Sequence, residues 1–140
     1  MLFRVEATPE ALKWIARLAV KHGPLMFYQH HGCCQGAPAP LCLPMGEYKV
    51  GETDLLLGEI GGYPFYMSAE QFRQWRDIQA IIDVTPGFAS GFSIEGPEGI
   101  GFFTRLRNFT DAEIEQLAAA GEPPSALPGV GPNHLVGARL

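Results

Sequence analysis

The sequence predicts an α+β domain in which short, mostly antiparallel strands pack with two or three helices. Three observations predict this fold class. Helical segments carry capping residues at their ends, short runs rich in β-branched and aromatic residues lie between them, and tight turns join successive runs. Strands that are joined by tight turns pair antiparallel, because a parallel partner needs a long crossover connection.

The first predicted helix lies within residues 6–23. Thr8 is its expected N-cap, Pro9 suits the first turn, and Gly23 is the expected stop. A strand is expected over 24–30. The apolar stripe of the helix that should face the core comprises Leu12, Ile15, Leu18 and Ala19.

The middle of the chain is predicted to hold short strands and a second helix. Gly61 and Gly62 suit the two-residue turn of a hairpin, which needs positive φ. Ser68 and Gln71 form a capping-box pattern that opens a helix over 69–77. The strands expected before this helix cover residues 46–50, 55–60 and 63–67.

The last part of the chain predicts more strands and a terminal helix. A β-branched run predicts a strand, and two further runs flank the turn sequence PEG as a hairpin. Thr110 and Glu113 form a second capping box, whose helix occupies 110–121. Residues 122–140 are rich in proline and have no apolar period, so we expect a mobile tail after a single domain over 1–109. The three strands are expected over residues 78–84, 91–96 and 99–106.

Composition excludes several classes of function. The chain has 140 residues, 46% of them hydrophobic and 18% charged, which is typical of a folded domain. Its net charge is −5, and it lacks the cluster of Lys and Arg that nucleic-acid binding requires. No stretch approaches the ~20 apolar residues of a membrane helix, and the first ten residues do not resemble a signal peptide. We therefore expect a cytoplasmic protein that binds neither nucleic acid nor membranes.

The strongest chemical signal is the segment QHHGCCQGAPAPLCLPM, residues 29–45. It holds all three cysteines and two of the four histidines of the chain. In a reducing cytosol, clustered cysteines more often bind metal or do redox chemistry than form structural disulfides. Thiolates suit zinc, copper(I) and iron–sulfur clusters, and imidazole suits zinc and iron. The candidate metal ligands are Cys33, Cys34, Cys42 and either His31 or His30.

Two other interpretations of this segment stay open. Neighbouring side chains of an extended chain point to opposite sides, so either Cys33 or Cys34 can act together with Cys42. A thiolate of lowered pKa could instead attack a carbonyl or form a reversible disulfide with Cys42. Each cysteine could also be a small buried hydrophobe. The carboxylates on predicted strands are expected to face solvent; they are Glu59, Asp83 and Glu95.

The order of several motifs resembles a known family. The motifs are GCCQGAPAPLC, GEYKVGETDLLLGEIGG, PFYMSAEQFRQW, IIDVTPG and GFSIEGPEGIGFFTR, within about residues 3–109. Together they resemble an uncharacterised bacterial family, domain of unknown function 779, whose genes are typically found beside acetaldehyde dehydrogenase genes. The resemblance implies an accessory role in aldehyde or alcohol oxidation, with an aldehyde dehydrogenase as partner.

A more distant resemblance is to the HesB-like A-type iron–sulfur carriers. A helix, a strand and a glycine–cysteine loop follow one another in both, with a cluster cysteine at the place of Cys33 or Cys34. The carriers end in Cys-Gly-Cys, whereas this chain has no cysteine after Cys42. The resemblance implies a HesB-like sandwich and a bound iron or zinc ion or iron–sulfur cluster, held by one loop or across a homodimer. The expected function is that of a metal-binding accessory protein and not of an enzyme.

Overall fold

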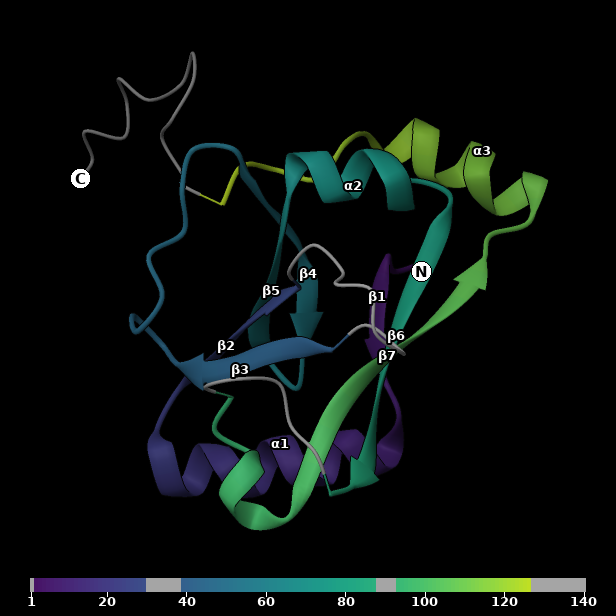
Figure 1. The fold of residues 1–140 in the computed structure, drawn as a ribbon. Coiled ribbons are helices and arrows are strands. Elements are labelled where there is room, and N and C mark those ends of the chain that lie inside the picture. The colour runs from purple at the N-terminus through teal and green to yellow at the C-terminus, as the bar shows by residue number, and fades with distance from the viewer. Residues whose placement is uncertain (1, 30–38, 88–92, 127–140) are drawn as a thin grey trace.

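The α+β fold class is confirmed by a computed structural model, which describes residues 2–29, 39–87 and 93–126. Two small sheets form the middle of the molecule, with α1 at one end and α2 and α3 at the other (Figure 1). The helices are α1 (Pro9–His22), α2 (Ala69–Trp75) and α3 (Asp111–Ala120), with a short 3-10 helix η1 (Gly96–Glu98). The strands are β1 (Val5–Ala7), β2 (Leu25–Gln29), β3 (Pro40–Pro44), β4 (Asp54–Ile60), β5 (Tyr63–Ser68), β6 (Ile78–Pro86) and β7 (Ile100–Asn108).

Both sheets are mixed. One has the order β1-β6-β7 and the other has the order β3-β2-β5-β4. β1 pairs parallel with β6 and β2 pairs parallel with β5, while the other three pairs are antiparallel. The tight turns predicted from the sequence produce antiparallel pairs such as β4–β5, in which Gly61 and Gly62 have φ of +60° and +89°. No helix in the described ranges is long and apolar enough to cross a membrane.

The helix N-caps are confirmed, but the capping box predicted at Ser68 is only half formed, because Gln71 Oε1 accepts no hydrogen bond from the described residues. One predicted core position is wrong. Thr8 Oγ1 accepts a hydrogen bond from the Ala11 backbone N–H at 3.1 Å, and Gly23 ends α1 with φ of +83°. The buried residues of α1 are Ala11, Ile15 and Leu18. Their spacing of four and three places the stripe through Ala11, so Leu12 is rotated away from the core and is 41% exposed.

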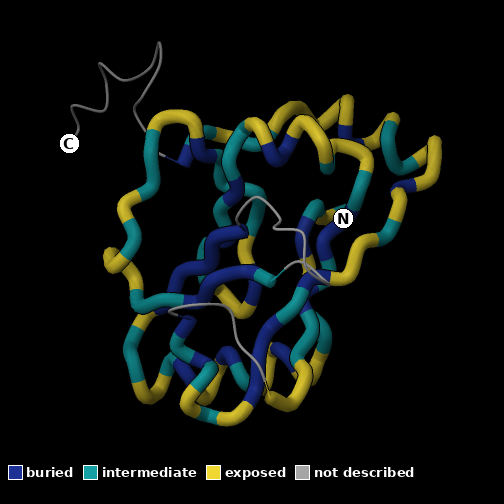
Figure 2. Tube along the Cα trace, in the orientation of Figure 1, coloured by how far each residue is buried: buried dark blue, intermediate teal, exposed yellow. Residues whose placement is uncertain are grey.

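The core lies between the two sheets and is centred on aromatic rings. Phe27 of β2 stacks on Phe65 of β5 at 6.2 Å between ring centroids and meets Phe102 of β7 edge-on at 5.9 Å. All three rings are buried, and the central strands are the most buried part of the trace (Figure 2). Phe27 therefore joins the four-stranded sheet to the three-stranded one.

The strand predicted over 46–50 is wrong, because those residues form turns and bends. The strand lies earlier, as β3, which pairs antiparallel with β2 from Leu25 opposite Pro44 to Gln29 opposite Pro40. Proline removes a backbone donor and is tolerated in sheets mainly on edge strands. β3 is an edge strand with a proline at each end, which is why its sequence resembles a loop.

The strand predicted over 91–96 is also wrong for the described residues 93–96. Glu95 has φ of −79° and ψ of −14°, a helical conformation, and η1 follows it directly. The predicted hairpin is thus replaced by a tight turn before β7.

The segment after α3 pairs with the edge of β4. The Leu56 N–H donates to the Pro124 carbonyl at 2.8 Å, and the Ala126 N–H donates to the Asp54 carbonyl at 2.9 Å. Ala126 is buried. The predicted tail therefore begins with ordered residues that cover part of an exposed strand edge, and 127–140 lie outside the described residues.

Candidate functional site

The five predicted metal ligands fall into two groups. His30, His31, Cys33 and Cys34 lie outside the described residues, so their ligand roles stay predictions. Cys42 lies in β3, directly opposite Phe27 of β2. Within residues 2–29, 39–87 and 93–126, no group of three or more His, Cys, Asp or Glu side chains could hold a metal ion.

The β2–β3 register fixes where that segment begins and ends. Gln29 and Pro40 are paired residues at the end of the hairpin, so residues 30–39 leave and rejoin the sheet at one point. Cys34, the most distant of the four outlying candidates from Gln29, is five residues along the chain, a reach of at most ~17 Å.

Buried polar side chains lie between the two sheets, and we call them the inter-sheet polar cluster. Its members are Gln29, Ser93, Glu95 and Thr104. Thr104 Oγ1 donates to Gln29 Oε1 at 2.7 Å, linking β7 to the last residue of β2. This bond joins the two sheets where the cysteine-bearing connection starts.

Ser93 and Glu95 tie the turn before β7 to β3. The Cys42 N–H donates to Ser93 Oγ at 2.7 Å, and the Ile94 N–H donates to the Cys42 carbonyl at 2.9 Å. The Ser93 hydroxyl donates to Glu95 Oε1, and the Phe102 N–H donates to Glu95 Oε2 at 3.0 Å. The carboxyl group of Glu95 therefore accepts hydrogen bonds at both oxygens in a site closed to solvent.

Glu95 contradicts the expectation that the strand carboxylates face solvent. Its side chain is 0% exposed, whereas Glu59 is exposed, as predicted. Burial raises the pKa of Glu95, and the hydrogen bonds from Phe102 and Ser93 oppose that rise. A carboxyl group in this position can hold a proton at a pH where an exposed one has lost it.

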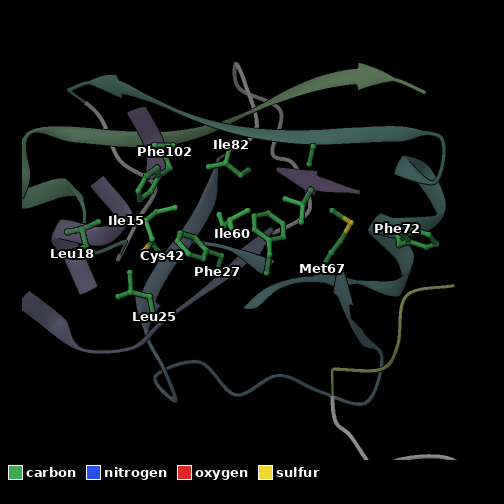
Figure 3. Close-up of a cluster of buried hydrophobic side chains, with 14 residues drawn as sticks. Ile15, Leu18, Leu25, Phe27, Cys42, Ile60, Met67, Phe72, Ile82 and Phe102 are labelled. Atoms are coloured by element: carbon green, nitrogen blue, oxygen red, sulfur yellow. The ribbon is translucent and has the colours of Figure 1, made fainter. Parts of the chain in front are cut away.

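The Cys42 thiol is kept neutral by the same surroundings. Its side chain is 0% exposed and lies among Ile15, Leu25, Phe27 and Phe102 in the core (Figure 3). Burial raises its pKa, and the nearby Glu95 carboxylate raises it further. The thiolate is the reactive and metal-binding form, so Cys42 has the surroundings of a structural cysteine.

We expect Cys42 to resist thiol reagents while the protein is folded. In a Cys33→Ser/Cys34→Ser variant Cys42 is the single thiol, and its reaction with Ellman's reagent should be at least ~10³-fold slower in buffer than in urea. The absorbance of the released thiolate measures both rates. Similar rates in buffer and in urea would show that the thiol is accessible in the native protein.

The residues of the inter-sheet polar cluster carry no clear sequence signal. In a strand, Ser93 and Glu95 would lie on one face and Ile94 on the other. The sequence therefore favours Ile94 as the buried residue. The helical backbone of Glu95 breaks that alternation. The Ser93 hydroxyl and the Phe102 N–H of β7 both donate to the Glu95 carboxyl group, and only the folded structure reveals these bonds.

Comparison with known proteins gives a family and no described activity. A family model with the description domain of unknown function (DUF779) matches residues 14–108, from within α1 to the end of β7. No curated protein matches the chain. Because the matched region includes six of the seven described strands and covers well over half of the sequence, the chain belongs to the DUF779 family.

Proposed function

We propose that the chain is a metal- or iron–sulfur-binding accessory protein whose ligands lie on the connection between β2 and β3. The ligands are Cys33 and Cys34, with His31 or His30 as an imidazole donor. The observation that supports this is the pairing of Gln29 with Pro40, which holds both ends of the connection at one point of the sheet. Thiolates together with imidazole are a donor set for zinc or iron.

Cys42 occupies a separate position in this proposal. It lies two residues inside the hairpin, with its thiol in the core and its pKa raised. A ligand role for Cys42 stays a prediction, and its burial favours a packing role. Loss of metal and loss of packing have different signatures, so one set of variants separates them.

The finer parts of the proposal come from the resemblances described above. An iron–sulfur cluster follows from the likeness to HesB-like carriers, and an aldehyde dehydrogenase partner follows from the gene association of the family. A cytoplasmic location completes this proposal. The chemistry of the metal would be that of soft thiolate ligands, which suit zinc and iron–sulfur clusters.

The deciding experiment is elemental analysis of untagged protein purified without oxygen. We expect about one equivalent of zinc or iron in the wild type, consistent with a single site. The Cys33→Ser/Cys34→Ser variant should lose it, whereas Cys42→Ala should keep it and unfold at a lower urea concentration. Chelation should lower the melting temperature of the wild type and not that of the double variant.

Two results would contradict the proposal. A wild type without metal would contradict metal binding. It would favour thiol chemistry, in which Cys33 or Cys34 is the attacking group. Equal metal in the wild type and in the Cys33→Ser/Cys34→Ser variant would place the ion elsewhere. Co-purification with an aldehyde dehydrogenase, with no metal present, would favour a plain interaction subunit.

A further inference from the structure

Helices α2 and α3 lie at one end of the molecule (Figure 1). A cavity of about 90 Å³ there is lined by residues from the end of α2, from α3 and from the residues before β1. Arg4 lines it from the residue before β1, Arg76 from the end of α2, and Ile114 and Leu117 from α3. One water molecule needs only ~10–15 Å³ of such volume. The cavity therefore has room for a small molecule of several heavy atoms.

Two guanidinium groups line the cavity. The guanidinium carbons of Arg4 and Arg76 each lie 4.9 Å from the ring centroid of Phe72, which holds both groups in place. Arg4 Nη1 donates to the Arg76 carbonyl at 3.1 Å. Arg76 also pairs with Glu122, which follows α3.

Arg4 has donors to spare for a ligand. A guanidinium carries five N–H donors, and within the described part of the chain one hydrogen bond, to the Arg76 carbonyl, uses them. Arg4 has no carboxylate within ion-pair distance among these residues, and burial lowers its pKa. The charges of Glu122 and Asp77 oppose that shift only in part, so an anion placed directly against the Arg4 guanidinium adds a contact that neither carboxylate makes.

The surroundings select the kind of anion. Asp77 and Glu122 also line the cavity, so its two positive charges face two negative ones, and a dianion such as phosphate gains little. Ile114 and buried Leu117 supply an apolar part of the lining. A planar carboxylate matches the guanidinium fork, and a short aliphatic tail matches the apolar part of the lining.

We propose that this cavity binds a short-chain aliphatic monocarboxylate. Its carboxylate lies between Arg4 and Arg76, and its tail packs against Ile114 and Leu117. The cavity shares no residue with the proposed metal ligands, so binding here is independent of any metal on the β2–β3 connection.

The test is a titration of the full-length chain with sodium butyrate, followed by amide chemical shifts in ¹⁵N–¹H NMR spectra. We expect saturable shifts at Arg76 and Leu117 with a Kd on the order of 1 mM. Butyramide, which has the same shape without the charge, should bind at least ~10-fold more weakly. Inorganic phosphate should also bind more weakly than butyrate.

Matched variants assign the effect to Arg4. Arg4→Gln should weaken butyrate binding at least ~10-fold, and Arg4→Lys, which keeps the charge without the planar fork, should weaken it as well. Arg17→Gln is the control, because Arg17 also stacks on an aromatic ring, that of Trp14, but lies on α1. The amide spectra show directly that each variant is folded.

Five outcomes would overturn the site, four of them concerning the ligands and the Arg4 variants. These four are the absence of saturable shifts with butyrate, equal binding of butyramide, tighter binding of phosphate, and unchanged binding in both folded Arg4 variants. An equal loss of binding in Arg17→Gln would also overturn it, because the effect would then be one of net charge.

Discussion

Glu95→Ala is expected to lower the free energy of unfolding by about 3 kcal/mol at neutral pH. The substitution leaves two buried donors without an acceptor, the Phe102 N–H and the Ser93 hydroxyl. An unsatisfied buried donor costs ~1–3 kcal/mol. Urea unfolding followed by tryptophan fluorescence measures the change, and a loss below ~1 kcal/mol would show that water or another group replaces the carboxyl.

The pH dependence of Glu95→Gln isolates the titration of the same group. Burial raises the pKa of Glu95 in the folded protein above its ordinary value of 4.5. The stability that its protonated form contributes is complete below that ordinary value and is lost as pH rises through the folded pKa. Glutamine does not titrate, so the advantage of the wild type over Glu95→Gln should shrink as pH rises above 4.5.

Glu98→Gln is the matched control, because its pH trend has the opposite sign. The hydrogen bond and charge of Lys21, whose Nζ lies 2.7 Å from Glu98 Oε2, lower the pKa of Glu98. Its contribution is therefore present above the ordinary value and is lost as pH falls through the folded pKa. Parallel trends in the two variants would contradict the difference in their surroundings.

Phe27→Ala is expected to destabilise the protein by about 4 kcal/mol, the middle of the range for a buried phenylalanine. The ring is 0% exposed and contacts Phe65 in its own sheet and Phe102 in the other. Its removal leaves a cavity where the ring contacts both Phe65 and Phe102. Phe27→Leu keeps most of the volume and should cost less than ~2 kcal/mol.

Val20→Ala provides the surface control for this measurement. Val20 is 89% exposed on α1, so its truncation should change stability by no more than ~0.5 kcal/mol. Equilibrium urea unfolding of the three variants gives the comparison. A Phe27→Ala cost close to that of Val20→Ala would mean that the sheets do not depend on this ring for their contact.

The features that the sequence predicts well depend on residues close together in the chain. Thr8 and Thr110 each bond to a backbone N–H three residues ahead, and Gly61 with Gly62 forms a turn by itself. Such signals are complete within a few positions, so no tertiary information is needed.

The features that it misses depend on distant partners. β1 has three residues and exists because Val5 to Ala7 pair with Ala80 to Ile82. β3 is concealed by its prolines, which only an edge position allows. Glu95 resembles a solvent-facing strand residue until Phe102 and Ser93 are brought to it.

The candidate site shows the same division. The cysteine-rich segment is conspicuous in the sequence, and its chemistry follows from residue types alone. The sequence does not reveal that Cys42 faces Phe27 across a hairpin, because the register of β3 with β2 decides which face it takes.

The parallel pairing of β1 with β6 has a consequence for the order in which the protein assembles. Val5 and its partner Ala80 are far apart in the chain, whereas β2 and β3 are joined by a connection of ten residues between Gln29 and Pro40. Closing the longer loop costs about 2 kcal/mol more in chain entropy. On a ribosome the hairpin can close while β6 is still unmade, so β3 with Cys42 can pair with β2 before the sheet that shields Cys42 exists.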